Sequence, residues 1–275
     1  MFRKLFVFFL LLYSVILWLS NLLWYQYENF SQFHWFDDWQ EWKQMDKLGH
    51  LFSAFHLSSL LCTIVGYLLK KKTQPLPLPQ HDLVLFSSLI SFLLISSIEI
   101  LDGFAPTYGA SIYDLIANAL GAILFSVQKI YLSKFFVLPK FSFHFTKFAT
   151  ERPNVLGDNK LLQIFKDYNG QTYWYSLPFF SFFGKKHLPK WVSYIHLAIG
   201  YSAEEMIFGR AYQNEAIGLF PLRRYFISFD LHLPAFSSKY TLINSFIFLL
   251  NAIKLPLPTL EWNDRDGFVW HWIYF

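Results

Sequence analysis

Polar side chains that can exchange protons or hold a polar ligand stand at the ends of three apolar stretches. They are Asp46, Lys47, His50, Glu99, Asp102, Ser111, Asp114 and Asn118. Asp46 and His50 are four residues apart, so on a helix they lie on one face. Ionisable groups at membrane depth are costly unless they are paired or solvated. We therefore expect these residues to converge in a functional site.

Three of these residues are candidates for catalysis. Apolar residues precede Glu99, and a buried carboxyl group is suited to exchange protons with a histidine such as His50. Asp114 would orient His50, and Asn118 would fix a substrate headgroup. The predicted catalytic residues are His50, Glu99 and Asp114, and the predicted substrate-binding residues are Asp46, Lys47, Asp102, Ser111 and Asn118.

The same residues also have simpler explanations. Ser111 and Asp114 have the spacing of a helix-capping box, and Asn118 can join packed helices by a hydrogen bond. A metal site of His50, Glu99 and Asp114 is a further alternative. We predict no metal site, because no single element supplies two ligands in a His-x-Glu or His-x-x-x-His pattern. The sequence names no cofactor and does not decide whether the protein is an enzyme.

Four apolar segments position this cluster. They cover 5–23, 50–69, 83–101 and 112–132, and about 20 residues suffice to cross a bilayer. If four helices alternate in direction, the basic residues Arg3, Lys4, 70–72 and Lys129 fall on one side, which marks the cytoplasm. The cluster then lies at the outer face.

Between the first two segments, Trp35, Phe36, Trp39 and Trp42 recur at helical spacing and predict an interfacial amphipathic helix, with a soluble packed helix as the alternative.

The chain divides into three predicted regions. Residues 1–24 form a membrane anchor or signal segment, 25–148 a helical membrane domain, and 149–275 an α+β region. In the last region, alternating residues predict short antiparallel strands at 170–179, 194–202, 223–233 and 268–275, with a helix over 241–255. Four or five strands are too few for a membrane barrel. The predicted fold class is therefore a mainly α membrane protein with about four embedded helices and a smaller α+β region.

The composition excludes several classes of protein. Hydrophobic residues make up 54% of the 275 residues and charged residues 15%, against about 25% charged in soluble domains. An ordinary cytosolic protein and a disordered chain are therefore excluded. The formal charge of +4 is spread between apolar runs, so no nucleic-acid partner is expected.

Segments around the cluster resemble a known family. D-K-L-G-H (46–50), E-I-L-D-G (99–103) and S-I-Y-D-L-I-A-N-A-L-G (111–121) resemble the YfiM-like family of uncharacterised bacterial envelope proteins, of the Bacteroidetes type. A more distant similarity is to VanZ-like membrane proteins, which are associated with glycopeptide tolerance. The resemblance implies an envelope protein working near lipid or cell-wall headgroups, without a settled reaction. Lipoprotein members carry a cysteine near the end of their first apolar segment, and this chain has none there.

Two functions follow as hypotheses. In the first, an envelope membrane protein binds or modifies a lipid or cell-wall amphiphile at the cluster. In the second, a non-catalytic scaffold or outer-membrane assembly component docks through its C-terminal strands, with residues 268–275 contacting an envelope protein partner. We expect a multi-pass membrane protein with membrane lipids as partners. The inner membrane is favoured, and the outer membrane is the alternative.

Overall fold

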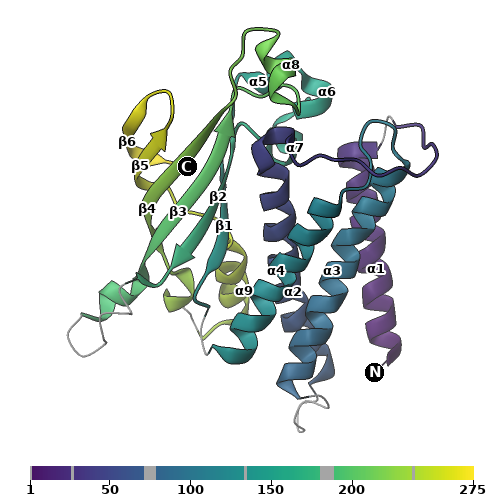
Figure 1. Ribbon diagram of the computed structural model, residues 1–275. Coiled ribbons are helices and arrows are strands. Elements are labelled where there is room, and N and C mark those ends of the chain that lie inside the picture. The colour runs from purple at the N-terminus through teal and green to yellow at the C-terminus, as the bar shows by residue number, and fades with distance from the viewer. Residues whose placement is uncertain (1, 26–27, 71–78, 133–134, 180–188, 237–238) are drawn as a thin grey trace. The chain divides into compact units, whose positions relative to one another are not determined.

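The computed structural model describes residues 2–25, 28–70, 79–132, 135–179, 189–236 and 239–275. The chain forms two compact units. The first contains Met1–Trp39 and Asp46–Phe135, and the second contains Gln40–Met45 and Phe136–Phe275. Figure 1 shows the long helices of the first unit and the sheet of the second.

The first unit is helical, as predicted. Its elements are α1 (Phe2–Ser20), the π-helical turn η1 (Asn21–Tyr25), α2 (Met45–Leu69), α3 (Gln80–Phe104) and α4 (Ile112–Tyr131). Among the described residues, three helices are long and apolar enough to cross a membrane: Phe6–Tyr25, Glu41–Leu69 and Gln80–Phe104. The predicted count of four is therefore not confirmed.

Small side chains let α2, α3 and α4 approach closely. The Ser91 hydroxyl on α3 donates to the Ala54 carbonyl on α2 at 2.9 Å, and the Ser126 hydroxyl on α4 donates to that of Ser88 on α3 at 2.7 Å. At Gly121, an added Cβ would lie 2.3 Å from the Leu51 carbonyl oxygen. Contacts of small and hydroxyl residues are typical of helices packed in membranes.

The predicted interfacial helix over 35–42 is wrong. The His34 amide donates to the Gly103 carbonyl at 2.8 Å, and the Phe36 amide donates to the Ala110 carbonyl at 2.9 Å. These backbone hydrogen bonds hold the segment extended along the α3–α4 connection. The indole spacing indicated a helix, but long-range backbone pairing determined the conformation.

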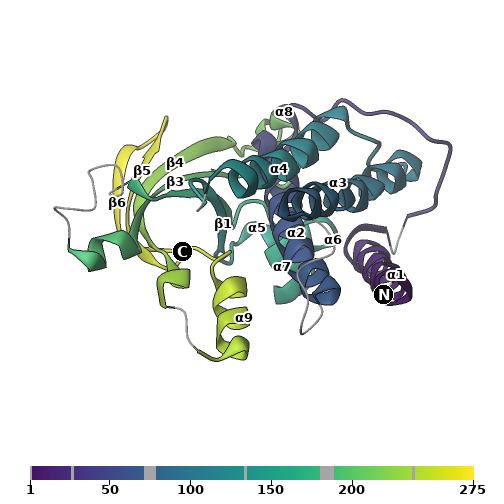
Figure 2. The same ribbon diagram turned by 90° about the horizontal axis from the view of Figure 1, so that it is seen from below.

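The second unit contains a six-stranded antiparallel sheet, ordered β1-β2-β3-β4-β5-β6, which is curved in Figure 2. The strands are β1 (Leu138–Phe143), β2 (Gln171–Leu177), β3 (Ile195–Glu204), β4 (Leu222–Leu231), β5 (Leu257–Asn263) and β6 (Gly267–Tyr274). The four predicted strands are confirmed. The sequence analysis missed β1 and β5, which contain Pro139 and Pro258, because proline argues against a strand.

Shorter elements connect the strands. They are α5 (Phe148–Glu151), α6 (Pro153–Leu156), α7 (Lys160–Lys166), η4 (Lys190–Tyr194), α8 (Ala211–Glu215), η5 (Leu233–Phe236) and α9 (Thr241–Leu250). The predicted helix over 241–255 is thus confirmed but ends earlier. The chain after α9 pairs with β1, where the Lys254 amide donates to the Phe141 carbonyl at 2.8 Å.

The two faces of the sheet have unusual polarity. On β4, Arg224, Ser228 and Asp230 are buried, whereas Ile227 and Phe229 between them are exposed. The buried charges are paired: Asp230 contacts Lys140 at 2.6 Å, and Arg224 contacts Glu261 at 2.6 Å. A small apolar core lies on the same face, made of Trp174, Ala198, Phe226 and Tyr274.

A left-handed turn of three non-glycine residues also belongs to the second unit. Trp42, Lys43 and Gln44 have φ values of 48°, 50° and 64°. The Tyr201 hydroxyl donates to the Lys43 carbonyl at 2.6 Å, and Arg223 donates to the Gln44 side chain at 2.8 Å. The unit's own hydrogen bonds therefore fix this strained turn.

Candidate functional site

The ends of three helices carry the predicted site residues in the first unit. Asp46, Lys47 and His50 lie in the first two turns of α2, and Glu99 lies near the end of α3. Ser111 is the N-cap of α4, where its hydroxyl oxygen accepts hydrogen bonds from the Tyr113 and Asp114 amides. These positions let residues from distant parts of the sequence meet.

The Lys47 ammonium group joins three carboxylates. It forms an ion pair with Asp38, and it lies 3.1 Å from Asp46 and 2.8 Å from Asp114. The Lys47 side chain is only 10% exposed. A buried ammonium needs such compensation, because removing a charge from water costs several kcal/mol.

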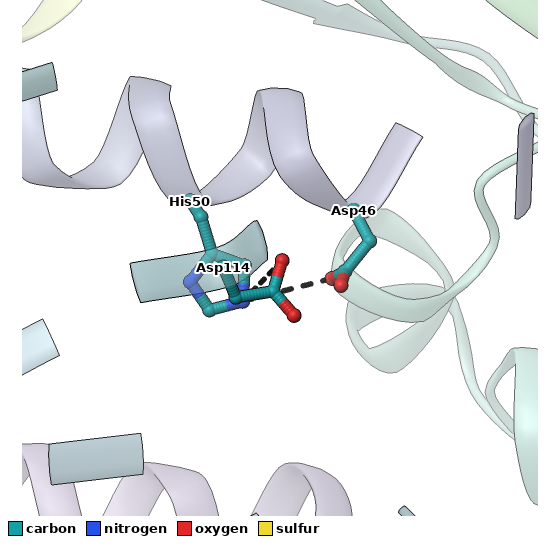
Figure 3. A group of neighbouring side chains, drawn as sticks. All are labelled: Asp46, His50 and Asp114. Carbon is teal, nitrogen blue, oxygen red and sulfur yellow. Dashed lines mark ion pairs between the residues drawn. The ribbon is translucent and has the colours of Figure 1, made fainter. Parts of the chain in front are cut away.

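His50 has two different environments at its two ring nitrogens. Nδ1 lies 3.1 Å from Asn118 Oδ1, an atom that can only accept, so Nδ1 carries a proton. Nε2 lies 3.6 Å from Glu99 Oε1, 3.8 Å from Asp46 Oδ1 and 3.9 Å from Asp114 Oδ1. Figure 3 shows the carboxylates of Asp46 and Asp114 beside the imidazole ring. Nε2 therefore faces three carboxylate oxygens, each beyond ordinary hydrogen-bond length.

Glu99 connects α3 to the start of α4 through one oxygen only. Its Oε2 accepts a hydrogen bond from the Ser111 amide at 3.1 Å, and its side chain is 3% exposed. Among the described residues, Oε1 is buried and has no hydrogen-bond partner. Asp114 Oδ1 also has no hydrogen-bond partner there. Its 2.8 Å approach to Lys47 is therefore an ion pair whose angles do not suit a hydrogen bond.

Direct contacts join all the predicted site residues except Asp102, whose charge acts on Glu99 and His50 through space. The Asp102 carboxylate instead accepts a hydrogen bond from the Tyr25 hydroxyl at 2.7 Å. Asn118 contacts His50 and, at 3.4 Å, the Ser96 hydroxyl. The roles assigned to all these residues remain predictions.

Asp38 is a member of the site that sequence reasoning missed. Its Oδ1 accepts a hydrogen bond from the Ser111 hydroxyl at 2.6 Å, and its other oxygen pairs with Lys47. No spacing signal pointed to Asp38, because it lies in the segment that was predicted to form a surface helix. We name the assembled group the His50 cluster; it consists of Asp38, Asp46, Lys47, His50, Glu99, Ser111, Asp114 and Asn118.

Two kinds of chemistry fit the His50 cluster. The 3.6 Å separation of His50 Nε2 and Glu99 Oε1 suits proton exchange after a small movement. Alternatively, Asp46, His50 and Asp114 each offer one ligand atom to a metal ion, and these atoms lie within 4.8 Å of one another. Asp46 is the most exposed of the three, with 27% of its side chain accessible, so a ligand would enter beside it.

Comparison with known proteins covers this helical unit. Residues 33–129 match the model of a family described as predicted periplasmic lipoprotein (DUF2279). The matched stretch contains the whole His50 cluster and supports an uncharacterised bacterial envelope family. No curated protein and no solved structure matches the chain. The description of that family refers to the periplasm, a compartment of the bacterial envelope.

Proposed function

We propose that this protein is a multi-pass membrane protein of the bacterial envelope that binds or modifies a lipid or cell-wall amphiphile at the His50 cluster. The observation that carries the proposal is the burial of this cluster between apolar helices. Ionisable side chains in such surroundings are expensive and usually functional. We assign the protein to the inner membrane, with the outer membrane as the alternative.

The surfaces of the helices support membrane insertion. Large apolar side chains are exposed on α1, α3 and α4, including Trp18 (63%), Leu89 (57%) and Ile123 (54%). The lipoprotein description of the family suggests a lipid anchor instead, but Cys62, the single cysteine, lies buried within α2. Insertion of several helices therefore explains the apolar surface better than one attached lipid.

The contacts suggest a role for each part of the cluster. His50 Nε2 and Glu99 Oε1 would exchange a proton with the headgroup, whereas Asn118 would hold the ring through Nδ1. Lys47 would keep Asp46 and Asp114 in place. This use of Asn118 differs from the headgroup contact expected from the sequence.

A deletion strain tests the proposal. Intact lipids and cell-wall fragments would be compared by mass spectrometry after rescue with wild type or with the Glu99→Gln, Asp114→Asn double variant at matched abundance. A Glu28→Gln, Asp82→Asn double variant is the control, because it changes two carboxylates of the same unit outside the cluster. We expect wild type and control to restore one chemical difference that the cluster variant leaves. Equal rescue by all three would refute the proposal.

The second unit supports a second candidate function, docking to an envelope protein. Within the described chain, β6 is the last strand of the sheet and pairs only with β5, so its outer edge can accept a strand from a partner. Phe268 (74%) and Trp272 (78%) on β6 are also strongly exposed. A partner that adds a strand there would cover these side chains.

Substitution is a better test than deletion of residues 268–275. Tyr274 packs against Phe226 with ring centroids 4.5 Å apart, so a deletion would also damage the core. A Phe268→Ser, Trp272→Ser variant should instead lose cross-linking to a specific envelope protein. A matched Tyr212→Ser, Phe220→Ser variant, exposed elsewhere in the same unit, should keep it. Unchanged cross-linking in the β6 variant would refute docking at this strand.

A further inference from the structure

The His50 cluster places several carboxyl groups around a single ammonium group. The carboxylates of Asp46, Glu99 and Asp114 surround the free end of one imidazole, and Lys47 is the ammonium group among them. Lys47 also pairs with Asp38, so one ammonium is shared by several carboxylates. Buried charges of one sign are unfavourable unless another cation is present.

The tautomer of His50 determines what Nε2 presents to these carboxyl groups. Because Nδ1 donates to Asn118 Oδ1 at 3.1 Å, a neutral imidazole presents the lone pair of Nε2 to the three carboxylates. A lone pair facing anionic oxygens at 3.6 to 3.9 Å is repulsive. A proton on Nε2, a proton shared with a facing carboxyl group, or a cation between the atoms can resolve the repulsion.

The distances favour a metal ion between them. A proton on Nε2 would form a hydrogen bond only if an oxygen lay within about 3.2 Å. Ligand atoms that share a metal ion with bonds of about 2.0–2.2 Å lie about 3–4 Å from one another, and the contacts from Nε2 fall in that interval. Glu99 Oε1, which is buried and has no hydrogen-bond partner among the described residues, lies 3.6 Å from the same nitrogen.

We propose that the His50 cluster binds one divalent transition-metal ion through His50 Nε2, Glu99 Oε1, Asp46 Oδ1 and Asp114 Oδ1. A donor set of one imidazole and several carboxylates suits Zn²⁺ or Mn²⁺. Asn118 fixes the metal-binding tautomer, as partners of ligand histidines commonly do. Lys47 donates to Oδ2 of Asp46 at 3.1 Å and so restrains this carboxylate beside His50. The ligands come from three helices, so no short motif marks the site.

The inference deepens the proposed function, because a bound cation would attract the anionic headgroup of an amphiphile. It rests on the same cluster but is tested separately. The full-length protein, without a polyhistidine tag, is purified in detergent, treated with a chelator and dialysed against Zn²⁺ or Mn²⁺. Metal content is then measured by mass spectrometry and affinity by titration calorimetry.

We expect one equivalent of metal per wild-type chain, and at least a tenfold loss of affinity in His50→Gln and Glu99→Gln. His56→Gln and Asp82→Asn are the controls. His56 lies on the same helix beside the rings of Phe52 and Phe55, and Asp82 is an exposed carboxylate of α3 that pairs with His81. Both controls should bind as wild type does.

A thermal melt separates misfolding from loss of a ligand. Metal should raise the melting temperature of wild type and both controls, whereas the cluster variants should melt cooperatively without a metal-dependent rise. Less than stoichiometric binding by wild type, or equal losses in controls and cluster variants, would overturn the metal site. A lipid change in the deletion strain would then still support the proposed function, and metal binding without such a change would refute only that function.

Discussion

Ser111 connects three parts of the helical unit through a single hydroxyl group. It accepts from the first amides of α4 and donates to Asp38, while its own amide donates to Glu99. The cap and the cluster are therefore one structure. The sequence pattern of Ser111 and Asp114 had suggested either a cap or a site, and the contacts include both.

Ser111→Ala should destabilise the helical unit by at least about 1–2 kcal/mol, because the N-cap hydrogen bonds are lost and a buried carboxylate loses its donor. The loss would appear as a lower melting temperature in detergent. Ser97→Ala is the control, since that hydroxyl donates to the Leu94 carbonyl of its own helix. Equal melting temperatures for the two variants would contradict the joint role of Ser111.

His196 should make the sheet sensitive to acid. Burial, together with the neighbouring His232 ring, lowers its pKa to about 4. The unfolded chain binds a proton below about pH 6.5, but the folded sheet does not until about pH 4, so stability falls as pH falls through this interval. The full effect is about 3 kcal/mol.

Hydrogen exchange of β3 and β4 peptides measures this loss between pH 7 and pH 5. The His196→Gln variant should show a flatter pH dependence, because glutamine does not titrate. His81→Gln, which changes an exposed histidine of the other unit, should retain the slope of wild type. The same slope in all three proteins would exclude His196 as its source.

At the scale of elements, the left-handed turn at Trp42–Gln44 allows the cost of its backbone conformation to be measured apart from the contacts of its side chains. Left-handed backbone costs roughly 1–2 kcal/mol for a residue with a Cβ atom. Lys43 contributes its carbonyl to Tyr201, and any residue supplies that carbonyl. The stability of variants at position 43 should therefore depend on how well each residue tolerates the left-handed backbone.

Lys43→Gly should be more stable than Lys43→Ala by about 1 kcal/mol, which reverses the usual order of these residues in a right-handed helix. Thermal melts of the two purified variants provide the comparison. Both lack the lysine side chain, so each is the control for the other. The ordinary order, with alanine more stable, would mean that position 43 does not keep its left-handed conformation.

Local periodicity predicted the long helices and the strands with uninterrupted alternation. It failed where a distant segment decided the outcome. Residues 35–38 are extended because they pair with the α3–α4 connection, and β1 forms despite Pro139 because β2 supplies its partner. In the site, helix ends predicted the meeting of His50, Glu99 and Asp114. Asp38 could not be predicted, because it reaches Ser111 through the backbone pairing of its segment with the α3–α4 connection.

For the molecule as a whole, the proposed membrane insertion predicts which loops lie on the same side of the bilayer. Lys70 directly follows α2, and Thr107 lies between α3 and α4; both are exposed. If α3 crosses the bilayer, these positions lie on opposite sides. With the basic residues at 70–72 on the cytoplasmic side, the Lys70 end would lie in the cytoplasm.

Single-cysteine variants Lys70→Cys and Thr107→Cys, made in a Cys62→Ala background, should therefore react differently with a membrane-impermeant maleimide. We expect labelling of position 107 in spheroplasts and of position 70 only after lysis. The background protein without either cysteine is the control for labelling. Labelling of both positions in spheroplasts would contradict a membrane-crossing α3.

The placement of Gln40–Met45 within the second unit constrains how this protein can evolve. A gene rearrangement that joined residues 136–275 to another membrane protein would leave these six residues behind. Tyr201 and Arg223 would then lose their partners at Lys43 and Gln44. The two units are compact separately, but they must be inherited together, or the recipient must supply an equivalent turn.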